Sequence, residues 1–65
     1  MTNLQERIKV ARERVRKMNQ ESDRLYQKYL ETGEELYKEM SMAAEQGARE
    51  TMTAIIEAER DLRGE

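Results

Sequence analysis

The sequence predicts an all-α fold: a two-helix antiparallel hairpin that dimerises into a four-helix bundle. Apolar residues recur at steps of three, four or seven along nearly all of the 65 residues, which is the spacing of one helix face. The pattern is interrupted at Gly33, the midpoint of the chain. A single hairpin of this size buries too little apolar area to offset its chain entropy, so we expect a second copy to complete the core.

The first helix is predicted over residues 3–31 of a single domain that covers residues 1–65. Thr2 and Gln5 stand in capping-box order just before the apolar pattern begins. Residues of high helix propensity dominate the segment, and no proline interrupts it. Lys28 lies near the last turn, where the helix dipole favours a cation. We therefore expect Thr2 to cap this helix.

The predicted turn comprises residues 32–33. Glycine tolerates the left-handed backbone conformation that ends helices, so Gly33 is expected to terminate the first helix. Thr32 and Glu35 are spaced as a second capping box, which is expected to start the second helix over residues 34–62. Within that helix, Gly47 predicts a close helix crossing opposite Met18.

Charge favours the antiparallel arrangement. The chain up to Thr32 carries eight Lys and Arg against five Asp and Glu, and the remainder carries four against nine, so the halves have net charges of +3 and −5. Opposite charges attract when the halves pair antiparallel. Folding at residues 32–33 brings together positions whose numbers sum to about 66. This register predicts the ion pairs Arg7 with Glu59, Lys9 with Glu57 and Arg16 with Glu50.

The alternative architecture is one uninterrupted coiled-coil helix, whose ends would lie about 90 Å apart. A left-handed supercoil requires a sustained seven-residue repeat. Strict spacing holds only in the first half, and the pattern then drifts through Tyr37, Met40, Ala44, Ala48 and Thr51. The drift favours the hairpin.

Two sets of residues are candidates for binding other macromolecules. The apolar pattern supplies a predicted self-association core, which consists of Leu4, Ile8, Val15, Met18, Leu25, Leu36, Met40, Ala44, Gly47, Ala48, Ile55 and Leu62. All three tyrosines lie around the turn, and Tyr is enriched at interface hot spots while Met adapts to varied partners. The candidates for contact with another protein are Tyr26, Leu30, Tyr37 and Met42. These sets predict a small homo-oligomeric binding or regulatory module that acts through protein–protein contact.

A basic segment supports a second hypothesis, the binding of RNA or DNA by one face of the first helix. Its cations are Lys9, Arg12, Arg14, Arg16 and Lys17. In length and topology, the predicted dimer resembles the Rop family of helical hairpins, which bind paired RNA hairpin loops. The chain as a whole has a net charge of −2, and no aromatic residue interleaves these cations to stack on bases. Pairing with acids of the second helix is therefore the favoured role of the segment.

A third hypothesis is an amphipathic coat on an apolar granule or lipid surface. The run ETGEELYK at residues 31–38 and the alanine-containing segment 43–48 resemble phasins, the proteins that coat storage granules. This resemblance implies helices that insert apolar side chains into the surface and keep charged ones wet. The acidic second helix disfavours anionic membranes.

The composition argues against catalysis and metal binding. The chain contains no His and no Cys, so the usual general base, the usual zinc ligands and disulfides are missing. The densest carboxylate group lacks the spacing of a calcium loop; it consists of Glu31, Glu34, Glu35 and Glu39. We expect no enzyme, cofactor, metal or small-molecule substrate. No apolar run approaches the roughly 20 residues of a membrane span, and no secretory signal is recognisable, so the expected location is cytoplasmic.

Overall fold

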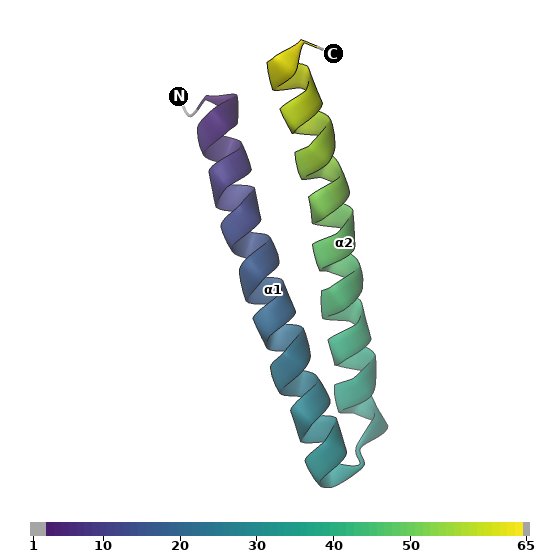
Figure 1. The fold of residues 1–65 in the computed structure, drawn as a ribbon. Helices are drawn as coiled ribbons and strands as arrows, with labels where there is room; N and C mark the ends of the chain where they lie inside the picture. The colour runs from purple at the N-terminus through teal and green to yellow at the C-terminus, as the bar shows by residue number, and fades with distance from the viewer. Residues whose placement is uncertain (1–2, 65) are drawn as a thin grey trace.

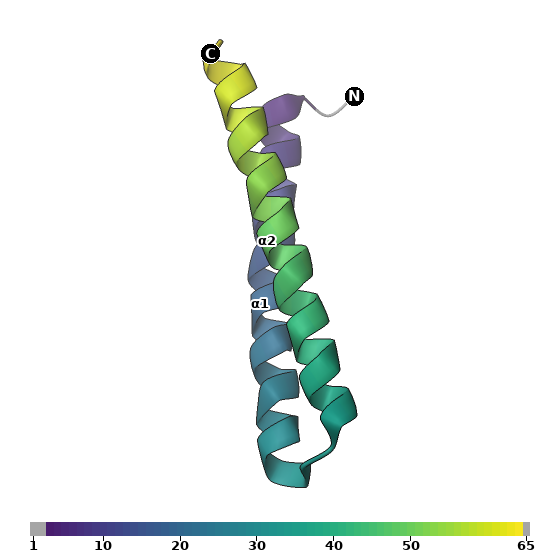
Figure 2. The ribbon, with the colours of Figure 1, turned by 90° about the vertical axis from the view of Figure 1, so that its right-hand side faces the viewer.

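The computed structural model describes residues 3–64 as two helices joined by a two-residue turn (Figure 1). Helix α1 spans Leu4–Thr32 and helix α2 spans Glu35–Arg63, with 29 residues each. The helices run antiparallel along their full length, so the start of α1 and the end of α2 lie at the same end of the molecule (Figures 1 and 2). The predicted all-α hairpin is confirmed. The alternative of one continuous helix is wrong, because the chain reverses direction at Gly33 and Glu34.

Helix α1 begins at a side-chain cap. The Oδ1 atom of Asn3 accepts a hydrogen bond from the backbone N–H of Glu6 at 2.9 Å, which satisfies one of the unpaired donors at the helix start. The predicted cap at Thr2 lies outside the described residues. Asn3 fills the role with the same three-residue spacing.

The turn depends on one glycine. Gly33 has a φ of 74°, in the left-handed region, and its N–H donates to the carbonyl of Tyr29 at 2.7 Å. Thr32 remains within α1, where its Oγ1 donates to the carbonyl of Lys28 at 2.8 Å and accepts from the N–H of Glu34 at 3.2 Å. The predicted capping box of Thr32 and Glu35 is therefore wrong. Glu34 has the extended backbone of an N-cap and starts α2 without a side-chain cap.

The two helices meet along a seam that repeats every seven residues on both sides. The seam consists of three layers whose residue numbers each sum to 63, namely Ile8 with Ile55, Val15 with Ala48, and Ser22 with Ser41. All six residues are buried. The register therefore differs by three residues from the predicted sum of about 66. Of the residues in the predicted drift, Met40 does not reach the seam: it is 44 % exposed, and Ser41 occupies the seam in its place.

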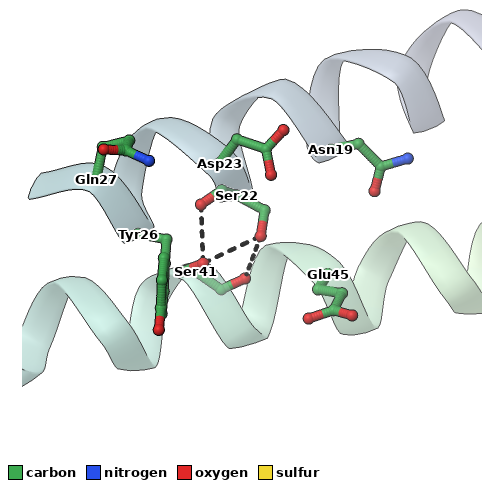
Figure 3. A pocket seen from close by; sticks show the side chains of 7 residues that line it. All are labelled: Asn19, Ser22, Asp23, Tyr26, Gln27, Ser41 and Glu45. Carbon is green, nitrogen blue, oxygen red and sulfur yellow. Dashed lines mark hydrogen bonds between the residues drawn. The ribbon is translucent and has the colours of Figure 1, made fainter. Parts of the chain in front are cut away.

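The serine layer is a buried polar contact with reciprocal hydrogen bonds (Figure 3). Ser22 Oγ donates to the carbonyl oxygen of Ser41 at 3.0 Å, and Ser41 Oγ donates to the carbonyl oxygen of Ser22 at 2.8 Å. The two Oγ atoms lie 3.0 Å apart. Each hydroxyl has one proton, so the two bonds to carbonyls use both. The layer is thus satisfied without water, and its small side chains allow the helices to approach closely.

A double-mutant cycle tests this assignment of the protons. Ser22→Ala and Ser41→Ala are each expected to lower the free energy of unfolding by about 1 kcal/mol, because each removes one hydrogen bond to a carbonyl that stays in place. The double variant should lose the sum to within about 0.5 kcal/mol, as measured by urea unfolding. Thr53→Ala, which removes an exposed hydroxyl, is the control and should change little. A strong coupling between the two serines would show instead that the hydroxyls bond to each other.

Candidate functional site

The hairpin leaves most of its large apolar side chains in contact with solvent. Within residues 3–64, the buried hydrophobic residues are Ile8, Val15, Leu25, Ala48 and Ile55. The exposed large ones are Val10, Tyr26, Leu30, Leu36, Met40, Met42, Ile56 and Leu62. Large apolar side chains that gather on one exposed face mark interaction sites in small proteins. The candidate functional site is therefore a surface for binding.

The structure divides the predicted self-association core into two groups. Most of its members pack between the two helices of one chain, either buried or half-buried along the seam; these are Leu4, Ile8, Val15, Met18, Leu25, Ala44, Gly47, Ala48 and Ile55. Leu36, Met40 and Leu62 are exposed. The first group stabilises the hairpin, and the second keeps between 44 % and 61 % of its surface free to contact another molecule.

One flank of α2 carries a row of apolar residues, which we call the Met40 face. It consists of Leu36, Met40, Ala43, Gly47 and Ala54. Their spacing of four, three, four and seven residues places them on one side of the helix. Positions 40, 47 and 54 each come one residue before a seam position of α2, which are 41, 48 and 55. One residue corresponds to a rotation of about 100° around the helix axis, so this row lies to the side of the seam. Leu36 is 61 % exposed, so this face has no cover in the hairpin.

Gly47 faces α1, as predicted, but the hairpin leaves room for a side chain there. A Cβ atom at this position would lie 3.7 Å from the Sδ of Met18, which is an ordinary van der Waals distance. Gly47 is half-buried and lies within regular helix. The contact with α1 therefore does not by itself require glycine.

The turn end of the hairpin contains all three tyrosines. The ring centroids of Tyr26 and Tyr29 lie 5.8 Å apart. Lys28 Nζ lies 5.6 Å from the ring centroid of Tyr37, and Lys38 Nζ lies 5.6 Å from that of Tyr29, so two cation–π contacts cross between the helices in opposite directions. Tyr37 is thereby half-buried, whereas the other predicted partner-binding residues are exposed; these are Tyr26, Leu30 and Met42.

The flank opposite the Met40 face is polar. Beside the serine layer, a groove is lined by Asn19, Ser22, Asp23, Tyr26, Gln27, Ser41 and Glu45 (Figure 3). Farther along this flank, Arg12 of α1 forms an ion pair with Glu59 of α2, and Arg49 donates to Glu45 at 2.8 Å. Arg12, Glu59, Arg49 and Glu45 are thus already paired within the chain.

The predicted interhelix ion pairs are wrong. Glu59 binds Arg12 in place of Arg7, and Arg16 binds Glu13 of its own helix in place of Glu50. Among the ion pairs of residues 3–64, none joins Lys9 to Glu57. Helical side chains lean towards the N-terminus of their own helix, so an α1 side chain leans away from the turn and an α2 side chain leans towards it. The α2 ion that meets a given α1 ion therefore stands farther from the turn than the residue level with that α1 ion. The physical reason is therefore side-chain direction together with the corrected register.

The candidate nucleic-acid residues do not form one uniform patch. Arg12 is engaged by Glu59, and Arg16 donates to Glu13 at 2.6 Å. That hydrogen bond lowers the pKa of the Glu13 carboxyl and raises the pKa of Arg16. Arg14 lies with Val10 on the flank of α1 away from Arg12, and the remaining candidates are Lys9 and Lys17. The five cations therefore point in several directions around α1.

The carboxylates of the described residues do not form a metal site. Within residues 3–64, no group of three or more Asp or Glu side chains is arranged to hold a metal ion, and the acids at positions 31, 34, 35 and 39 do not converge. In the same part of the chain, neither helix is long and apolar enough to span a membrane.

No protein-family model, no curated protein and no solved structure matches the chain.

Proposed function

We propose that this protein is a small self-associating helical module, located in the cytoplasm, that acts through contacts with other proteins and has no catalytic activity. The observation that carries the proposal is the imbalance, in the described part of the chain, between five buried hydrophobic residues and eight large exposed ones. Burying one large apolar side chain contributes about 1.5–3 kcal/mol, so association would recover stabilisation that the single hairpin lacks.

The architecture supports a binding role over a catalytic one. Two helices form a single layer whose interior is the seam, and side chains pack that seam from Ile8 and Ile55 to Ser22 and Ser41. Enzyme sites need a cavity that shields the reacting groups from water. We infer that the first partner is a second copy of the chain. Exposed residues near the turn end, Tyr26, Leu30 and Met42, are the proposed contact with another protein.

The two other hypotheses are less well supported. A phosphate-binding face needs several free cations in one direction, whereas Arg12 and Arg16 are paired with carboxylates. A lipid or granule coat favours a basic border around its apolar face, whereas the outer edge of α2 beside the Met40 face carries Glu50 and Glu57. Protein–protein contact therefore agrees best with the observed charges.

The solution mass tests the proposal. Sedimentation equilibrium at about 100 µM is expected to give twice the chain mass of 7.7 kDa, and the midpoint of thermal unfolding should rise with protein concentration. The mass should persist in high salt, because the proposed contact is mainly apolar. A monomer at that concentration contradicts the proposal. Salt-sensitive binding of an RNA hairpin, or a gain of helicity on lipid vesicles, would favour one of the other two hypotheses.

A further inference from the structure

We propose that a second copy of this chain packs on the Met40 face, related to the first by a two-fold axis that runs along the helices. The two turns then lie at the same end of the dimer. Each α2 packs beside the partner's α2, and each α1 lies on the outside beside the partner's α2. This inference rests on the self-association proposed above and specifies its face and its topology.

The Met40 face offers apolar surface that the hairpin leaves unused. Leu36 and Met40 are 61 % and 44 % exposed, and the small residues beside them allow another helix to approach. The opposite flank also has exposed apolar residues, but Glu45, Arg49 and Glu59 interrupt them and are already engaged in ion pairs. Burying that flank would remove paired charges from water, which is costly.

The size of the hairpin agrees with one interface on a broad face. The molecule measures 48 Å by 20 Å by 14 Å along its principal axes. The broad face of the hairpin, 48 Å by 20 Å, has an area of about 960 Å². A stable interface needs about 800 Å² from each partner. A second copy must therefore cover most of the length of the hairpin, along both helices.

The two edges of this face carry opposite charges. On the α1 edge, Arg7 and Arg14 have no ion-pair partner within residues 3–64. Glu21 follows at the same seven-residue spacing, and its charge is compensated by Arg24 at 3.1 Å. On the outer α2 edge, Glu57 has no ion-pair partner in the same range. The face is therefore basic on its α1 side and acidic on its α2 side.

The register of the seam places these charges at matching heights. Ile8 is level with Ile55, and Val15 is level with Ala48. Arg7 is therefore level with position 56, which precedes Glu57, and Arg14 is level with position 49, which precedes Glu50. A two-fold axis along the helices preserves height and exchanges the edges, so basic residues meet the partner's acids. An axis across the helices would reverse the heights and place α1 beside the partner's α1, so that of these charges only Arg14 would come level with an opposite charge, the partner's Glu21. Charge complementarity thus selects the first arrangement.

Charge exchange provides the first test. Arg7→Glu with Arg14→Glu (the first variant), and Glu50→Arg with Glu57→Arg (the second variant), are each expected to weaken homodimerisation by at least about tenfold, because like charges then face each other twice. An equimolar mixture of the two variants should form a heterodimer of near wild-type affinity, measured by native mass spectrometry. Lys9→Glu with Arg16→Glu has the same charge change at the same spacing on the other flank of α1. This control should dimerise normally and should not rescue the second variant; equal rescue by it would overturn the inference.

Disulfide trapping provides the second test, because the chain has no native cysteine. In the proposed dimer, position 40 of one chain lies level with position 40 of the other, and the same holds for position 54. The single variants Met40→Cys and Ala54→Cys should therefore both form cross-linked dimers on mild oxidation. An axis across the helices could bring only one of them level, since the positions are about 21 Å apart along α2. Met42→Cys and Ile56→Cys are the matched controls, with the same spacing on the opposite flank, and should not cross-link.

The outcomes separate this inference from the function on which it rests. Cross-linking at positions 42 and 56 in place of 40 and 54 would overturn the Met40 face while leaving self-association intact. Cross-linking at position 40 or 54 alone would overturn the same-end topology. A wild-type chain that remains monomeric in sedimentation at about 100 µM would overturn both the inference and the proposed function.

Discussion

Replacing Ile55 by alanine is expected to lower the free energy of unfolding by about 3 kcal/mol. Ile55 is only 2 % exposed, and it packs in the layer with Ile8 near the open end of the seam. The substitution removes several buried carbon atoms and leaves a cavity, because a two-helix layer has few neighbours that could fill it. For a chain of this size, such a loss is a large part of the total stability. Urea unfolding followed by circular dichroism, at fixed protein concentration, measures it.

Ile56 provides the matched control for this prediction. It is the next residue in α2 and has the same side chain, but it is 47 % exposed on the polar flank. Ile56→Ala should change the free energy of unfolding by less than about 1 kcal/mol, since alanine also has the higher helix propensity. Equal losses at both positions would mean that α2 is rotated about its axis, and the seam would need to be reassigned.

Replacing Gly33 by alanine is expected to cost about 1–2 kcal/mol. A Cβ atom at this position would meet nothing within 4 Å, so the cost arises from the backbone alone, which has a φ of 74°. The chain cannot relax this angle without moving one helix relative to the other, because the turn has only two residues. Urea unfolding of the variant measures the effect.

Gly64 is the control for Gly33. It has nearly the same φ of 77°, and a Cβ atom there would likewise meet no neighbour within 4 Å, but it follows the last residue of α2. The end of a helix can fray at little cost, so Gly64→Ala should lower the stability by less than about 0.5 kcal/mol. A loss at Gly64 as large as that at Gly33 would contradict the explanation by turn geometry.

Local signals allowed the sequence to predict the elements of this fold. The apolar repeat, the absence of proline and the glycine at the midpoint placed both helices to within one or two residues. The details at the helix ends were less predictable, because several residues there can serve as a cap. Thr32 has a hydroxyl that can cap a following helix or bond back to its own, and the structure shows the second use.

The register could not be predicted in the same way. Hydrophobicity defines a seam only where its positions are apolar, and this seam includes Ser22 and Ser41, which are polar and small. With those two omitted, Met40 completes the apolar pattern of α2 and the layers shift by three residues. The register could have been predicted from the exact seven-residue repeat of positions 8, 15 and 22 in α1 and 41, 48 and 55 in α2. That repeat is complete only if serine is counted as a buried residue.

The candidate binding surface depended on that register. Leu36 and Met40 lie beside the seam, so hydrophobicity alone could not separate residues that pack within the chain from those left exposed. The sequence shows a charge difference between the two halves of the chain, which corresponds to the basic and acidic edges. Which basic residue lies level with which acid follows only from the seam layers of the structure. The pairing of Arg12 with Glu59 likewise depends on side-chain direction, which sequence spacing does not give.

The two-residue turn also determines the order in which the hairpin can assemble. Contacts beside it, such as those of Lys38 with Tyr29, join positions only nine apart, whereas the pairing of Arg12 with Glu59 closes a loop of 47 residues. The entropy lost on loop closure grows with loop length. Folding should therefore start at the tyrosines, and the contacts between the helices should then form one after another towards the open end of the hairpin. In the native state, hydrogen exchange should accordingly be fastest at the open end and slowest around the serine layer.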